Sequence, residues 1–169
     1  MSFIDGIHDF PKITKHFILL FVITLAAGYF TGFKFIKRTT ELSPSGIEQN
    51  YNGNESDEDA EKMLFKKSEG EILTTIHTHI LSFSLIFFCL GLVLLTVPMN
   101  AKLKSFLLLE PFISIIFTFG GIWMLWKDVA WFKYIVMISG MLLTISFTFS
   151  VLMIIKALFF GKSKNSTTS

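Results

Sequence analysis

The sequence predicts an all-α fold, a bundle of four transmembrane helices with one extramembrane loop. Of the 169 residues, 51% are hydrophobic and only 17% are charged, whereas soluble domains are about 25% charged. The charged residues gather between long apolar runs, which is the pattern that a bilayer imposes on a chain. The 20 phenylalanines fit this environment, because lipid accepts bulky apolar side chains on any face of a helix.

Four segments are long enough to cross about 30 Å of membrane hydrocarbon, which takes about 20 helical residues. None of them alternates polar with apolar residues, and each exceeds the roughly 9–11 residues of a membrane barrel strand. We expect one membrane domain over residues 1–169, with helices at 16–33, 69–97, 103–126 and 131–160 and an extramembrane loop at 34–68. Aromatic and basic residues near the segment ends, such as Trp126 and Lys127, favour the headgroup region.

The first segment has an alternative interpretation as a secretory signal, because Ala26 and Ala27 resemble a cleavage point. The apolar run continues through Phe33, however, and the acidic residues Asp5 and Asp9 precede it. A signal peptide normally begins with basic residues. We therefore expect a retained transmembrane helix.

The orientation in the membrane rests on the distribution of charge. Four crossings place both termini on one side and the loop on the other. Lysine and arginine, which mark the cytoplasmic side, divide almost equally between Lys12, Lys15, Lys102, Lys104, Lys156, Lys162 and Lys164 on the terminal side and Lys34, Lys37, Arg38, Lys62, Lys66, Lys67, Lys127 and Lys133 on the loop side. Our expectation is a bacterial inner membrane protein with cytoplasmic termini.

The loop contains signals of local structure. Residues 50–59 are rich in Asn, Gly, Ser and acidic residues, which predicts a turn or a mobile segment. Residues 57–67 could form a short helix on the membrane surface. Ser68 and Glu71 have the spacing of a capping box ahead of an apolar run, so the second long helix should begin at Glu69.

Small and polar residues line one face of each predicted helix. Helices in lipid associate through close backbone approach and hydrogen bonds, because apolar burial gives no preference between helix and lipid. The packing faces contain Gly28 and Gly32 in the first helix, Glu110, Ser114 and Thr118 in the third, and Gly140 and Thr144 in the fourth. We expect these faces to point into one bundle, with helix packing as their main role.

The presence of a carboxylate, Glu110, inside an apolar segment needs a separate explanation. It lies about seven residues inside the third helix, roughly 10 Å below the membrane surface. Inserting a carboxylate into the membrane at this depth costs about 2–3 kcal/mol of free energy, and charged residues in such positions often have a function. Pro111 follows it and can kink the helix. Two roles stay open: a neutral side chain bonded to a neighbouring helix, or part of a proton or ligand path.

The histidines raise the question of a haem or metal site. His16 lies about 30 Å from His77 and His79, so these residues cannot hold one iron within a subunit. His77 and His79 also face nearly opposite sides of their helix. His79 lies on the inward face, and Met124 and Met137 lie at a similar depth. We expect no cofactor, and we keep haem or copper bound through His79, Met124 and Met137 as an alternative.

Several function classes have no support in the sequence. The net charge of +2 is too small to indicate a nucleic-acid partner. The single cysteine excludes an intrachain disulfide and a Cys-rich zinc or iron–sulfur centre. No hydrolase, zinc-protease or nucleotide-binding motif occurs. Together these absences favour a protein that is not an enzyme.

Three short motifs together resemble a set of small four-helix bacterial membrane proteins. They are Tyr51-Asn52-Gly53-Asn54-Glu55 (Y-x-G-N-E) in the loop, His77-Thr78-His79 at the start of the second helix and Glu110-Pro111-Phe112 in the third. The resemblance covers roughly residues 44–150. It implies an architecture and a bacterial origin, and it assigns no activity and no catalytic residue.

The sequence therefore favours a non-enzymatic accessory or scaffold subunit of an inner-membrane assembly. Its expected partners are the lipid bilayer and either other membrane subunits or further copies of the same chain. An electron-transfer subunit that binds haem or metal through His79 is one alternative. A small transporter or proton path that uses Glu110 is the other.

Overall fold

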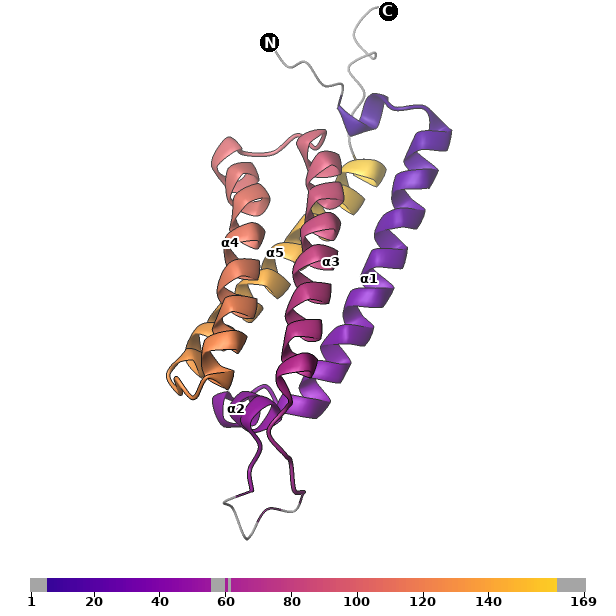
Figure 1. The fold of residues 1–169 in the computed structure, drawn as a ribbon. Coiled ribbons are helices and arrows are strands. Elements are labelled where there is room, and N and C mark those ends of the chain that lie inside the picture. The colour runs from indigo at the N-terminus through magenta and orange to yellow at the C-terminus, as the bar shows by residue number, and fades with distance from the viewer. Residues whose placement is uncertain (1–5, 56–59, 61, 161–169) are drawn as a thin grey trace, which may run out of the picture.

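The computed structural model describes residues 6–55, 60 and 62–160. Within these residues the chain forms a short 3-10 helix, η1, followed by five α-helices, whose arrangement Figure 1 shows. Their bounds are η1 (Ile7–Asp9), α1 (Lys12–Thr40), α2 (Pro44–Asn52), α3 (Glu69–Leu95), α4 (Ala101–Trp126) and α5 (Phe132–Phe160). The described part of the chain contains no strand. Four of the helices, α1, α3, α4 and α5, are long and apolar enough to cross a membrane, which confirms the predicted fold class.

The first long helix, α1, extends beyond the predicted range 16–33 at both ends. It begins after Pro11 and ends where Glu41 adopts a left-handed backbone conformation with φ 53°. The additional turns contain Lys12, Lys15 and residues 34–40, which hydropathy does not assign to the membrane. Hydropathy detects the part of a helix that crosses hydrocarbon, whereas hydrogen bonding continues the helix into the headgroup region.

The helix α2 was not predicted from the sequence. Ser43 caps its first turn by accepting a hydrogen bond from the Gly46 amide at 3.0 Å, and Pro44 occupies the first helical position. The expected surface helix over residues 57–67 is wrong where the structure describes this range, because residues 60 and 62–67 are not helical. Residues 57–59 and 61 lie outside the described residues.

The start of α3 agrees with its prediction. The Ser68 hydroxyl accepts from the Glu71 amide at 3.3 Å, and the Glu71 carboxylate accepts from the Ser68 amide at 2.8 Å. These two reciprocal bonds form the expected capping box. At the other end of the bundle, the Asn100 side chain caps α4 by accepting from the Lys102 amide at 2.9 Å.

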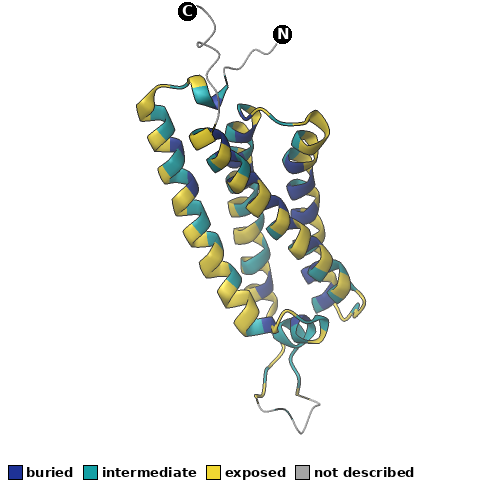
Figure 2. Cartoon of the chain, turned by 180° about the vertical axis from the view of Figure 1, so that it is seen from behind, coloured by how far each residue is buried: buried dark blue, intermediate teal, exposed yellow. Residues whose placement is uncertain are grey.

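The four long helices differ in how deeply they pack. Half of the residues in the apolar window of α4 are buried, and 39% in that of α5, against 17% in α3 and 11% in α1. The buried core includes Leu90, Ile115, Leu125 and Ile154. Figure 1 shows α1 standing to the side of α3, and Figure 2 shows that most of its surface is exposed. The helices α4 and α5 therefore form the centre of the bundle, and α1 is its most peripheral member.

Candidate functional site

Glu110 lies at the buried centre of the bundle, on α4. Its relative exposure is 8%, and two serine hydroxyls donate hydrogen bonds to its carboxyl group. Ser114 lies one turn further along α4 and bonds one oxygen, while Ser146 on α5 bonds the other. Since both carboxyl oxygens have a donor, the side chain is satisfied within the chain, and it joins α4 to α5 through a polar contact.

Two further polar pairs connect α5 to its neighbours. The Thr118 hydroxyl on α4 donates to the Ser139 hydroxyl at 2.7 Å. The Tyr29 hydroxyl on α1 donates to the Thr144 hydroxyl at 3.0 Å. Of these residues, the sequence singled out Thr118 and Thr144 but not Tyr29. The signal was present, because a tyrosine in the middle of an apolar segment needs a partner for its hydroxyl group.

A groove of about 530 Å³ lies between α4 and α5. Its walls are mostly apolar side chains such as Phe106 and Ile138, and its polar lining residues are Ser105, Glu110, Ser114 and Ser139. A space of this size is within the range of about 300–1,000 Å³ that small ligands occupy. Its mostly apolar lining suits an apolar chain, because Glu110 and Ser114 bond to each other and Ser139 bonds to Thr118.

Gly28 and Gly32 do not pack against another helix in the described part of the chain. Both residues are exposed, and a Cβ atom added at either position would meet nothing within 4 Å. The reason is the neighbouring Tyr29, whose ring stacks on Phe147 with centroids 3.9 Å apart. This aromatic contact turns the next face of α1 toward α5, about 100° away from Gly28.

The two predicted packing residues on α5, Gly140 and Thr144, differ in their contacts. Thr144 contacts α1 through its bond from Tyr29. Gly140 lies one turn earlier on α5, and a Cβ atom added there would meet nothing within 4 Å. Gly140 therefore does not provide close backbone approach to another described helix.

His79 is exposed on α3, and its contacts are aromatic. The Nδ1–H group donates to the Thr75 carbonyl at 2.8 Å. The ring lies 5.4 Å from that of Phe119 on α4. Met124 is exposed at the end of α4, and Met137 is half-buried on α5. Within the described residues, no three His, Cys, Asp or Glu side chains come together as a metal site.

The Y-x-G-N-E motif closes the loop by hydrogen bonds. The Asn54 amide donates to the Leu64 carbonyl at 2.9 Å, and the Asn54 side-chain oxygen accepts from the Leu64 amide at 2.6 Å. The Asn54 side-chain nitrogen donates to the Lys62 carbonyl at 2.9 Å. Gly53 has φ 81°, and a Cβ atom at this position would lie 2.8 Å from the Leu64 carbonyl oxygen. These contacts hold residues 62–64 away from a helical conformation.

The same motif fixes the loop to the end of α4. The Asn52 side chain donates to the Leu125 carbonyl at 2.8 Å, and the Trp126 indole donates to the Lys67 carbonyl at 2.8 Å. Lys66 forms an ion pair with Asp128 at 2.8 Å. Burial raises the pKa of Tyr51 to about 12. The role of the motif visible in the structure is to clamp the loop against the bundle.

The comparison with known families decides the classification. A family model named Aq_1264_TM, described as a transmembrane helical domain, matches residues 41–165. The chain belongs to this family. No curated protein and no solved structure gives a match. Membership of the family, together with the four apolar helices, establishes an integral membrane protein in contact with a lipid bilayer.

The Aq_1264_TM match begins directly after the last residue of α1, Thr40. The matched range therefore contains α2 to α5, with the polar centre around Glu110 and the clamped loop. The helix α1 precedes the match and is joined to the Aq_1264_TM domain by the bond from Tyr29 to Thr144, and its residues Ile18 and Val22 are part of the buried core. The fold thus consists of a packed family domain and one additional, loosely packed membrane helix.

Proposed function

We propose that this chain is a non-enzymatic accessory or scaffold subunit of a bacterial inner-membrane assembly, with both termini in the cytoplasm. In this proposal the Aq_1264_TM domain provides a stable membrane body, and α1 binds a transmembrane helix of another subunit or of a second copy. The observation that carries the proposal is the exposed face formed by Gly28 and Gly32.

The G-x-x-x-G face has the chemistry of a helix interface. Small residues allow two membrane helices to approach closely, which increases van der Waals contact where the hydrophobic effect gives no preference. Thr24 lies one turn before Gly28 and is also exposed, so the face continues along α1. Among the described residues, this surface has no neighbour at either glycine. It is therefore available to another helix.

The polar centre supports the same proposal. Glu110 accepts hydroxyl donors on both carboxyl oxygens, from Ser114 and Ser146. This arrangement suits a structural link between α4 and α5, because a carboxyl group with two donors needs no further ligand. A rigid family domain is what a scaffold subunit requires.

Enlarging the exposed glycines tests the proposal. Gly28→Leu with Gly32→Leu should convert a larger native assembly into single chains, because the side chains would separate the paired helices. The measurement is the mass of the particle extracted from membranes in native nanodiscs, together with the subunits that copurify. Since an added Cβ atom at either glycine meets no described residue within 4 Å, the fold of the variant should be intact.

Gly120→Leu is the matched control. Gly120 is also an exposed helical glycine with nothing within 4 Å of an added Cβ atom, but it lies on α4. This variant should keep the assembly. Wild-type particles that contain a single chain and no other subunit would overturn the proposal. So would an assembly that survives the α1 double substitution.

A further inference from the structure

The loop-side end of α1 carries three basic residues on one face, Lys34, Lys37 and Arg38. At 100° per residue they lie within about 100° of one another around the helix. All three are exposed. Within residues 6–55, 60 and 62–160, no side-chain hydrogen bond, ion pair or ring contact involves any of them. The cluster therefore holds three like charges in close proximity.

Three other lysines at this end of the bundle have side-chain partners. Lys133 pairs with Glu48 at 2.6 Å, and Lys66 pairs with Asp128 at 2.8 Å. Lys127 lies over the indole of Trp126, 4.6 Å from the ring centroid. The cluster on α1 differs from these lysines, because its charges face outward at the edge of the molecule. Repulsion within the cluster would be relieved by an external anion.

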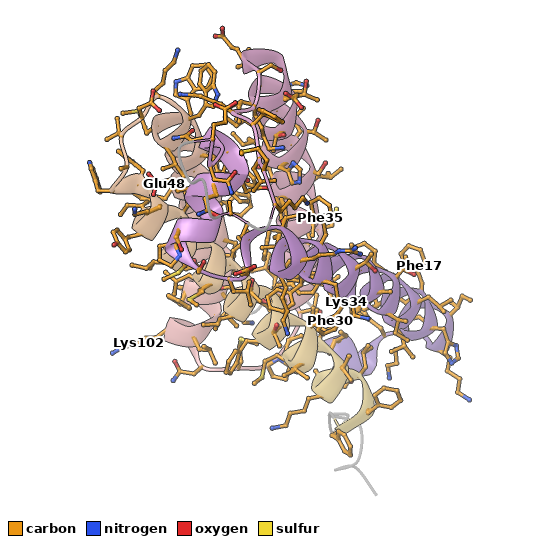
Figure 3. All side chains as sticks on the ribbon, turned by 90° about the horizontal axis from the view of Figure 1, so that it is seen from below. Phe17, Phe30, Lys34, Phe35, Glu48 and Lys102 are labelled. Carbon is orange, nitrogen blue, oxygen red and sulfur yellow. The ribbon has the colours of Figure 1, made fainter. Side chains whose placement is uncertain are left out.

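The position of the cluster corresponds to the headgroup region. Residues 17–33 contain no charged residue and span about 25 Å at 1.5 Å per residue, so Lys34 lies near the boundary of the hydrocarbon core of about 30 Å. Phe30 and Phe35 are 60% and 68% exposed on the same part of α1. Figure 3 shows α1 extending to one side of the other helices, with Phe30, Lys34 and Phe35 along it.

We infer that Lys34, Lys37 and Arg38 form a binding site for the phosphate groups of anionic lipids in the loop-side leaflet. Clusters of basic residues next to a membrane helix attract anionic headgroups. The exposed rings of Phe30 and Phe35 provide apolar contact for the acyl chains of the same lipid. This combination of charge and apolar surface favours a phospholipid over a free anion. The site is independent of the glycine face.

Lipid binding can be measured on the full chain. We would reconstitute the protein into mixed phosphatidylglycerol and phosphatidylcholine bilayers, extract it, and count the retained lipids by native mass spectrometry. Phosphatidylglycerol should be enriched several-fold over its share in the bilayer. The triple variant K34Q, K37Q and R38Q should lose most of this enrichment.

The control removes the same number of charges from the other end of the bundle. K12Q, K102Q and K156Q replace three exposed lysines that lie on three different helices, and this variant should keep the enrichment. Equal retention of the two lipids by wild type, or equal losses in both triple variants, would overturn the inference. Displacement of phosphatidylglycerol by millimolar inorganic phosphate would instead identify a free-anion site and would also overturn it.

Discussion

The carboxyl group of Glu110 on α4 accepts a hydrogen bond from the hydroxyl group of Ser146 on α5. Both residues are buried, with relative exposures of 8% and 0%. The bond therefore links the two most deeply packed helices through two buried side chains. Burying a carboxyl group here without hydrogen-bond donors would cost considerably more free energy than leaving it in water.

Glu110→Ala should destabilise the protein by about 1–3 kcal/mol, because it leaves the Ser114 and Ser146 hydroxyls without their acceptor. Glu110→Gln retains an acceptor and should cost less. Stability can be measured by denaturant titration in mixed micelles. A double-mutant cycle with Ser146→Ala should give a coupling of about 0.6 kcal/mol, the average for polar contacts between membrane helices. Additive effects of the two substitutions would contradict the contact.

Gly53→Ala should loosen the clamped loop. Gly53 has φ 81°, and the new Cβ atom would lie 2.8 Å from the Leu64 carbonyl oxygen. We expect a cost of about 1–3 kcal/mol and faster amide exchange at Leu64. Gly70→Ala is the control, because Gly70 is helical with nothing within 4 Å, and it should stabilise α3 by about 0.5–1 kcal/mol. Equal effects of the two substitutions would argue against the clamp.

Tyr51 should make stability fall at high pH. Burial raises its pKa to about 12 from an ordinary value of 10.0. The folded state therefore favours the neutral phenol, and this contribution is fully present below pH 10 and is lost as the pH rises toward 12. The loss should reach about 2–3 kcal/mol. Thermal unfolding between pH 9 and 12 would measure it as a steeper fall in Tm for wild type than for Tyr51→Phe. Identical pH profiles would exclude a buried phenol.

The cofactor alternative can be tested at His79. We expect the purified protein to show no haem band and no bound copper, and we expect His79→Ala to leave its absorption spectrum unchanged. His77→Ala is the control on the opposite face of α3. Haem or copper near one equivalent per chain, lost only in His79→Ala, would replace the scaffold proposal with an electron-transfer function.

The spans of the membrane helices could be predicted from the sequence because a bilayer imposes a length on every apolar segment. The capping box at Ser68 and Glu71 could be predicted because its bonds join residues three apart. The helix α2 was missed because it is short and mostly polar, and hydropathy carries no signal for it. Its cap at Ser43 and its proline at Pro44 are local signals that could have found it.

The rotation of α1 could not be predicted from local pattern. Two faces of α1 were suitable for packing, one with Gly28 and Gly32 and one with Tyr29. The choice depends on Phe147 and Thr144, which are more than a hundred residues away in the chain. In the same way, the sequence identified Glu110 as unusual but could not select Ser146 as its partner. Such choices depend on the relative positions of helices in three dimensions.

The attachment of α1 has a consequence for the order of events during biosynthesis. The bond from Tyr29 to Thr144 joins residues 115 positions apart, which at about 5–20 residues per second corresponds to roughly 6–23 s of translation. During this interval the first helix is already made, while the helix that receives its tyrosine is not. A neighbouring nascent chain or a waiting subunit could therefore engage α1 before α5 emerges from the ribosome.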